Sequence, residues 1–96
     1  MPHALLLRVT PVEFNSWLTA HRAASRARRD YGITDGPLYR DIDDPNVALV
    51  HLDVEDVNTA VAWFGSDAFR AASEGIVVQQ RRLWVAEELN TANTSP

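Results

Sequence analysis

The sequence predicts an α+β fold in which a four-stranded antiparallel sheet carries two helices on one face. Apolar runs with strand periodicity alternate with amphipathic segments in the order strand, helix, strand, strand, helix, strand. The 96 residues show no internal break in composition, which favours one domain with one core. Residues 47–54 have one wholly apolar side and one side with polar groups, as expected of a strand that helices cover on one face.

The first half of the chain predicts a strand followed by a helix. Residues 3–9 are a short apolar run that ends at a helix-start pattern. In this pattern Thr10 is the N-cap, Pro11 takes the first helical position and Glu13 completes a capping box. The helix should end near residues 31–32. Its apolar stripe contains Phe14, Trp17, His21, Ala24 and Arg28, and its solvent face carries Arg22, Arg26 and Arg29.

The next segment predicts a hairpin and a second helix. Residues 38–42 and 47–54 should pair as antiparallel strands across a turn at residues 43–46. Asp56 can cap the second helix, and Gly75 ends it. The inward positions of this helix, on either side of a break at residues 65–67, are Val57, Ala60, Val61, Phe64, Phe69 and Ala72.

Residues 82–87 are predicted as the last strand, so that residues 1–89 form the domain and residues 90–96 a disordered polar tail. Two such split units give the ferredoxin-like arrangement, with both helices on one face of the sheet. The third strand places Ala48, Val50, Leu52 and Val54 toward the helices, and Val47, Leu49, His51 and Asp53 on the other side. A second sheet must cover that other side, so the sequence predicts a homodimer.

Composition excludes several classes of function. The net charge of −4 argues against nucleic-acid binding, and the absence of cysteine excludes disulfides, thiolate metal sites and thiol nucleophiles. The three histidines lack metal-ligand spacing and the four glycines lack phosphate-loop spacing, so neither a metal nor a cofactor is expected. The apolar N-terminal run is too short for a signal peptide or a membrane span, so the chain is expected to be cytoplasmic.

Several short patterns follow one another along the chain. They are residues 39–46, residues 49–56 with an acidic pair at their end, then Ala60, Trp63, Phe64, Ser66 and Phe69, and finally Gly75 and Ile76. In this order they resemble, over nearly the whole chain, the small dimeric α+β barrel proteins related to antibiotic biosynthesis monooxygenases and polyketide cyclases. The resemblance implies that two ferredoxin-like subunits close a barrel, with a small-molecule pocket between sheet and helices in each. It also implies chemistry without a cofactor on polyketide-like substrates.

His21 is the first candidate for catalysis. It lies on the apolar stripe one turn after Trp17, and an imidazole there can move a proton to or from an enolisable ketone. A core histidine bonded to a backbone carbonyl is the structural alternative. Tyr39 or Arg40 can stabilise an enolate oxygen, but they point to opposite sheet faces, so a given pocket can hold one of them. The predicted substrate-binding residues are Trp17, Ala24, Trp63, Phe64 and His51.

His51 and Asp53 lie two residues apart on one side of the third strand. A polar network with Arg8 or Arg40 as the counter-charge is favoured over a catalytic pair, because an unpaired buried aspartate is strongly destabilising.

Three functions follow from these observations. The leading hypothesis is an enzyme without a cofactor that cyclises or isomerises a polyketide-type ketone or enol, with a small hydrophobic or aromatic substrate. The first alternative keeps the pocket but lets the enolised substrate reduce O2, as in a cofactor-free monooxygenase. The second alternative is a dimer without catalytic activity that binds a ligand or a partner protein.

Overall fold

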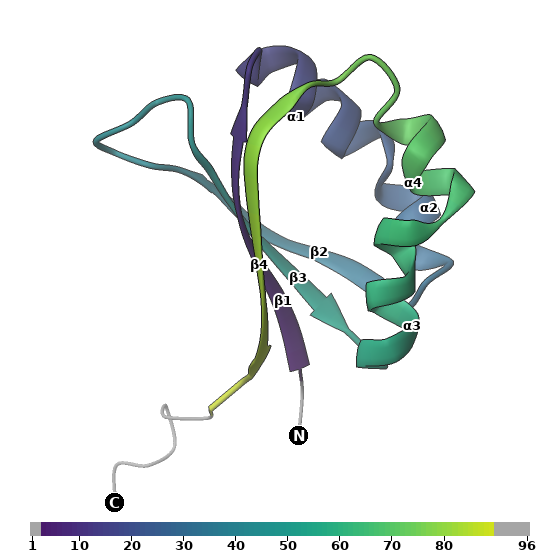
Figure 1. Ribbon diagram of the computed structural model, residues 1–96. Coiled ribbons are helices and arrows are strands. Elements are labelled where there is room, and N and C mark those ends of the chain that lie inside the picture. The colour runs from purple at the N-terminus through teal and green to yellow at the C-terminus, as the bar shows by residue number, and fades with distance from the viewer. Residues whose placement is uncertain (1–2, 90–96) are drawn as a thin grey trace, which may run out of the picture.

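The computed structural model describes residues 3–89 and contains one antiparallel sheet with helices on one side of it (Figure 1). The strands, in the spatial order β2-β3-β1-β4, are β1 (His3–Pro11), β2 (Ile33–Arg40), β3 (Ala48–Val54) and β4 (Val78–Glu87). The helical segments are α1 (Phe14–Ala23), α2 (Ser25–Arg29), α3 (Val57–Ala62), the 3-10 turn η1 (Trp63–Gly65) and α4 (Asp67–Ala72). This confirms the ferredoxin-like α+β fold. The tail expected over residues 90–96 lies outside the described residues.

The first helix begins later than the sequence predicts. Glu13 is the N-cap of α1, whereas Thr10 and Pro11 continue β1 and pair with Gln80 and Val78 of β4. A register shift separates these two pairs, and a strand end next to such an irregularity tolerates a proline, which cannot donate a backbone hydrogen bond. The predicted capping box is therefore wrong, because pairing with β4 takes up its first two residues.

The predicted single helix is divided at Ala24 into α1 and α2. The last carbonyl groups of a helix lack backbone donors, and at this break the guanidinium of Arg28 donates to the backbone carbonyl of His21 at 2.6 Å. The second piece ends close to the expected position. The chain turns at Gly32, whose φ of +71° favours glycine, and enters β2 directly after it.

Strand β2 starts earlier and ends earlier than the predicted residues 38–42. Its middle contains Gly36 and Pro37, which are poor strand formers and hide the alternation of apolar side chains. A register shift between Asp35 and Leu38 accommodates them. A Cβ atom on Gly36 would lie 3.0 Å from the carbonyl oxygen of His51, so this close approach of β2 to β3 favours glycine.

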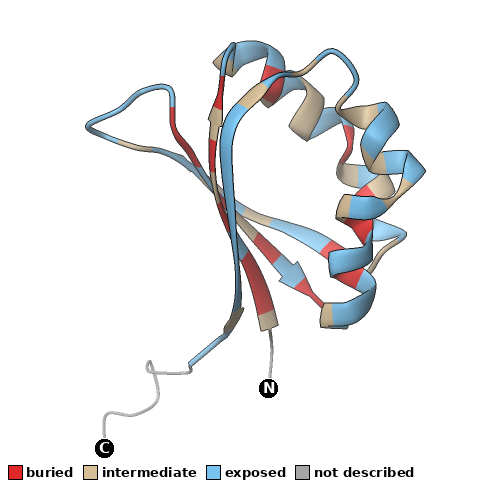
Figure 2. Cartoon of the chain, in the orientation of Figure 1, coloured by how far each residue is buried: buried red, intermediate tan, exposed pale blue. Residues whose placement is uncertain are grey.

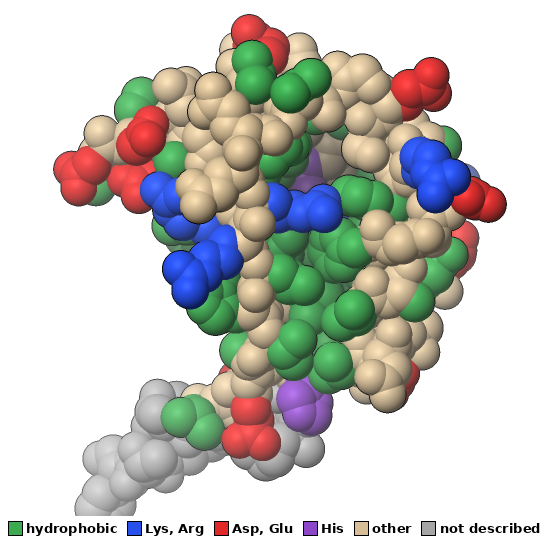
Figure 3. Space-filling model, in the orientation of Figure 1, with side chains coloured by type: hydrophobic (Ala, Val, Ile, Leu, Met, Phe, Trp, Pro, Cys, Tyr) green, Lys and Arg blue, Asp and Glu red, His purple; other side chains and the backbone are tan. Residues whose placement is uncertain are grey.

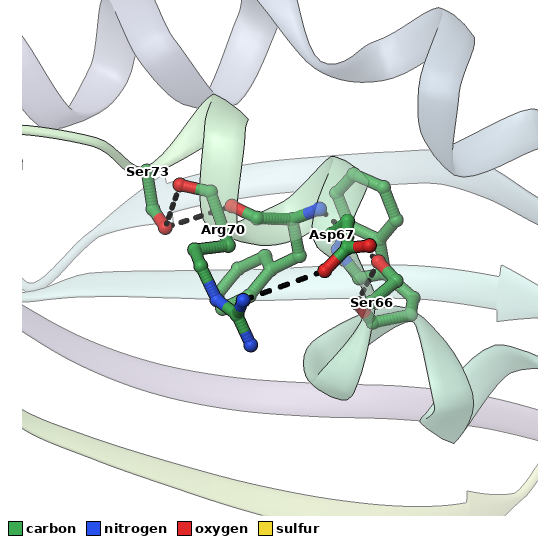
Figure 4. Close-up of polar contacts among 6 residues, drawn as sticks. Ser66, Asp67, Arg70 and Ser73 are labelled. Carbon is green, nitrogen blue, oxygen red and sulfur yellow. Dashed lines mark hydrogen bonds and ion pairs between the residues drawn. The ribbon is translucent and has the colours of Figure 1, made fainter.

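The helical segments of the second half begin at the predicted cap Asp56 and at the predicted break. The Asp56 carboxylate accepts hydrogen bonds from the amide and the hydroxyl of Thr59 at 2.9 and 2.7 Å. At the predicted break, the Ser66 hydroxyl donates to the Trp63 carbonyl at 2.6 Å and accepts from the Phe69 amide at 3.1 Å. Figure 4 shows the contacts of Ser66, together with the exposed ion pair between Asp67 and Arg70 on α4. Asp56 therefore caps the start of α3, and Ser66 caps the start of α4.

The core lies between the sheet and the helices (Figure 2). Its buried members are Leu5, Leu7, Val9, Ile33, Ala48, Val50, Leu52 and Val54 from the strands, and Trp17, Ala24, Ala60 and Trp63 from the helical segments. The side of β3 that the sequence assigns to the helices therefore does face them. Val47 was assigned to the opposite side as part of this strand, but it precedes β3 and is buried. Its carbonyl accepts a hydrogen bond from the Asp41 amide.

The opposite side of the sheet, called the open face here, has no helix of residues 3–89 over it (Figure 1). Large apolar side chains on it are 37–58 % exposed and form what we call the open-face patch, made of Leu6, Tyr39, Leu49 and Trp84. The register pairs Leu6 of β1 with His51 of β3 and with Trp84 of β4, so Leu6 lies in the middle of this patch.

Candidate functional site

A cavity of about 400 Å³ lies between the sheet and the helices. Figure 3 shows the hollow, with β4 on one side of it and helical segments on the other. Its lining residues are Leu7, Val9, Trp17, His21, Arg28, Val50, Leu52, Trp63, Phe64, Phe69, Ser73, Ile76, Val78, Gln79, Gln80 and Arg81. Apolar and aromatic walls with a few polar groups are typical of a small-molecule site, and the volume falls in the usual range for one.

His21 is an uncharged base in the wall of this cavity. Its ring stacks on the indole of Trp17 one helical turn earlier, with 5.1 Å between centroids and 18° between planes. Burial is the main cause that lowers the pKa of His21 from 6.5 to about 4, and the nearby Arg28 and Arg22 cations lower it further, against the opposing effect of Asp35. At neutral pH the imidazole can therefore accept a proton, as the sequence-based interpretation requires.

Arg28 and Asp35 form an ion pair next to His21. The Arg28 Nε and Nη2 atoms donate to the two carboxylate oxygens of Asp35, both at 2.8 Å, and Nη2 also donates to the His21 carbonyl. The Arg28 side chain is 4 % exposed and that of Asp35 is 30 % exposed. The hydrogen bond from Arg28 is the main cause that lowers the pKa of the Asp35 carboxyl. The pair thus fastens α2 and the end of α1 to β2.

The structure brings four of the predicted site residues together. Trp17, His21, Trp63 and Phe64 all line the cavity, while Ala24 lines a smaller adjoining cavity of about 60 Å³ together with Trp17 and His21. The helical spacing of Trp17, His21 and Ala24 was the signal that grouped them. The lining from β4 was missed, because the predicted strand began at residue 82.

Tyr39, Arg40 and His51, which the sequence analysis named as candidate catalytic or substrate-binding residues, do not line this cavity. Tyr39 and His51 point to the open face because side chains alternate along their strands. Arg40 points to the helix side, but its guanidinium packs over the ring of Phe14 at 4.0 Å from the centroid. None of the three therefore reaches the position from which it would stabilise an enolate beside His21.

The partner of Asp53 also differs from the prediction. Its Oδ1 atom lies 3.0 Å from Nε2 of His51, and no ion pair joins it to Arg8 or Arg40 in the described part of the chain. The Asp53 side chain is 53 % exposed and that of His51 is 33 % exposed in the single chain. The larger polar network that was expected around a buried aspartate is therefore not observed among the described residues, and only the contact between these two residues is present.

Among residues 3–89, no three or more histidine, aspartate or glutamate side chains converge in a way that could hold a metal ion. Within the same residues, no helix has both the length and the apolar character needed to cross a membrane.

The burial of His21 makes folding stability depend on pH. Its pKa is about 4 in the folded protein and has the ordinary value of 6.5 in the unfolded chain, so the unfolded state binds more protons between these values. We expect the free energy of unfolding to fall as the pH decreases from 6.5 to about 4. Above pH 6.5, His21 should cause no such decrease. Urea denaturation across this pH range should show a smaller loss for His21→Gln. An equal loss in both proteins would contradict the burial of a neutral His21.

Asp35→Asn should destabilise the protein by about 1–3 kcal/mol, because it leaves the buried Arg28 cation without its carboxylate. A matched control is Asp67→Asn, since the pair between Asp67 and Arg70 is almost fully exposed and should contribute little. Chemical denaturation measures both variants. Equal effects of the two substitutions would show that the Arg28–Asp35 pair has no structural importance.

Together, these features define a ferredoxin-like α+β protein with a ligand-sized, mainly apolar cavity and an uncharged histidine in its wall. No protein-family model matches the chain, and no curated protein matches it in sequence.

Solved structures do match it over almost their full length. A "Putative antibiotic biosynthesis monooxygenase from Nitrosomonas europaea" matches with a TM-score of 0.73 and 10 % identity, covering 94 % of this chain and 92 % of the other. Proteins of the same description from Bacteroides thetaiotaomicron and Bordetella bronchiseptica match with TM-scores of 0.71 and 0.70, each at 15 % identity. They cover 92 % and 93 % of this chain, and 90 % and 99 % of their own. Its structural neighbours are thus proteins described as antibiotic biosynthesis monooxygenases, and the shared feature is the fold.

Proposed function

We propose that this protein is an enzyme of the antibiotic biosynthesis monooxygenase type. It binds a small aromatic or polyketide-derived compound in the cavity, His21 removes an acidic proton, and the substrate anion reacts with O2 without a bound cofactor. The observation that carries this proposal is the neutral His21 imidazole in an apolar cavity of ligand size. The fold that the chain shares with proteins described as monooxygenases supports it.

The cavity walls suit a flat substrate with an acidic C–H or O–H group. Trp17 stacks on His21, and Trp63 and Phe64 supply further aromatic surface for a ring. A base with a pKa of about 4 is weak on its own. Proton transfer inside the cavity, however, replaces two neutral groups by an imidazolium next to an anion, and this attraction raises the pKa of the imidazole during the reaction.

The oxidation balances without an external reductant. When a substrate methylene group becomes a carbonyl group, the carbon loses four electrons and two protons, and O2 accepts the four electrons. One oxygen atom becomes the carbonyl oxygen and the other leaves as water. The protein has to bind the substrate, take the first proton on His21 and return it to the departing oxygen.

Two observations favour oxygenation over the cyclisation or isomerisation that led the sequence-based hypotheses. The descriptions of the structural neighbours include monooxygenases and a "Possible Oxidoreductase". Tyr39 and Arg40, which were expected to hold an enolate oxygen for ring closure, lie outside the cavity. Cyclisation, isomerisation and oxygenation all begin with the same proton removal. They differ in the group with which the substrate anion then reacts.

Oxygen consumption tests the proposal. A hydroxyanthrone is added to the chelator-treated protein in an oxygen electrode, and a sample without protein gives the background rate. We expect one O2 consumed for each quinone formed. Rearrangement of the substrate without O2 uptake would indicate an isomerase instead. Binding without any turnover of this and related phenols would indicate a binding protein.

We also propose that the protein is a homodimer in which two open faces pack together. Four large side chains of the open-face patch are between 37 % and 58 % exposed in the single chain, and no described helix covers them. Exposed apolar side chains gathered on neighbouring strands are typical of interaction sites. Sheet-to-sheet packing would bury it and would also enclose the His51–Asp53 contact.

A further inference from the structure

The charge of the cavity differs in sign from that of the whole protein. The chain has 13 acidic and 9 basic residues, yet the described residues that line the cavity include two arginines and no aspartate or glutamate. One of these, Arg28, is compensated by Asp35. The other, Arg81, forms no ion pair within the described part of the chain.

Arg81 lies where the cavity opens between β4 and the helices. Its register partner in β1 is Val9, a core residue, so its side chain points to the helix side of the sheet. The guanidinium carbon lies 5.3 Å from the ring centroid of Phe64 and 5.1 Å from that of Phe69. Figure 3 shows a basic side chain that reaches from β4 across the hollow, with a histidine side chain deeper inside.

This geometry leaves Arg81 able to bind a ligand. Contacts with aromatic rings use the flat side of a guanidinium, whereas the N–H groups point outward in its plane. Those N–H groups match the two oxygens of a carboxylate. Arg81 is an exposed residue, so its N–H groups are accessible to a ligand that enters the cavity.

We propose that Arg81 is an anion-binding subsite at the mouth of the cavity and that the preferred ligands are aromatic acids. The ring of the ligand occupies the apolar cavity beside Trp63 and Phe64, and its carboxylate pairs with the Arg81 guanidinium. This deepens the proposed function by naming the class of substrate, and it rests on that function for the reaction. Binding itself requires no turnover.

The test compares two ligands that differ by one carboxylate, 1-hydroxy-2-naphthoate and 1-naphthol. Titration calorimetry, or quenching of the fluorescence of Trp17 and Trp63, gives their affinities for the wild-type protein. Since a charge-assisted hydrogen bond in such a site is worth roughly 10- to 100-fold in affinity, we expect the acid to bind more tightly by about that factor. Arg81→Gln should remove this preference, and Arg81→Lys should keep part of it.

The adjacent arginine supplies the matched control. Arg82 has Arg8 as its register partner, points to the open face and packs on Trp84 at 5.0 Å. Arg82→Gln changes the net charge equally but should leave the preference for the acid unchanged. Thermal melting confirms that each variant is folded.

Equal affinities of the two ligands, or failure of both to bind the folded wild-type protein, would overturn the subsite. So would an equal loss of acid affinity in Arg81→Gln and Arg82→Gln. These outcomes are separate from the oxygen test. A preference for the acid that depends on Arg81, without O2 consumption, would leave the subsite standing and the oxygenase function wrong. O2 consumption without a preference for the acid would support the oxygenase function and contradict the subsite.

Discussion

His21→Gln should lower the turnover rate by roughly 10²- to 10⁴-fold, the usual contribution of a positioned group that transfers a proton. Glutamine has a similar size and no charge, so it can occupy the space beside Trp17 without placing an ion in an apolar wall. It cannot, however, accept a proton near neutral pH. Substrate affinity and the fold should therefore change little. Steady-state rates per folded molecule, together with a melting curve, measure the effect.

The same substitution at His51 is the matched control, because His51 lies on the open face and contacts Asp53 rather than the cavity. We expect His51→Gln to keep the turnover per folded molecule. If His21→Gln instead lowers stability while turnover per folded molecule is unchanged, His21 is a structural histidine, and the proton-transfer mechanism is wrong.

Leu6→Asp should convert the protein from a homodimer to a monomer. Leu6 lies in the middle of the open-face patch between its register partners His51 and Trp84. In a dimer that packs two open faces, the substitution would place two aspartates in the middle of the interface, where the loss of hydration of their charges opposes association. Sedimentation velocity at micromolar concentration separates the two states.

Val61→Asp is the control for this prediction. Val61, which the sequence analysis expected to point inward, is 39 % exposed, so that prediction is wrong. Its exposure is close to the 38 % of Leu6, but Val61 lies on α3, on the helix side of the sheet. The control should remain a dimer. A wild-type protein that sediments as a monomer would contradict the proposed assembly, and dissociation by both variants would contradict the location of the interface.

Periodicity predicted those parts of the fold in which burial alone determines the pattern. The apolar side of β3 and the Asp56 cap of α3 follow from local sequence, and both are confirmed. The start of α1 and the first half of β2 do not follow from it. Pro11 lies in a strand because β4 pairs with it, and Gly36 lies in a strand that β3 approaches closely. The sequence of one segment does not show which other strand lies beside it.

Only part of the candidate site could be predicted, because periodicity identifies buried positions but not their neighbours. Trp17 and His21 were found because helical spacing places them on one buried stripe. Arg28 lies on the same stripe, but its partner Asp35 fell outside the predicted strand, so the ion pair was not predicted. Arg81 was missed because the predicted β4 began one residue after it. Tyr39 and His51 were also named as candidate site residues, although the alternation along the third strand already placed His51 on the other face.

The most direct test of the account is to mix the protein with a hydroxyanthrone in the absence of oxygen and to record the absorbance spectrum of the bound compound. If neutral His21 removes the proton inside the cavity, the spectrum of the substrate anion should develop without oxygen in the wild-type protein and not in His21→Gln. On admission of O2 the anion should decay to the quinone. Quinone formation before O2 is admitted, or an anion that forms equally in the His21→Gln variant, would contradict the account.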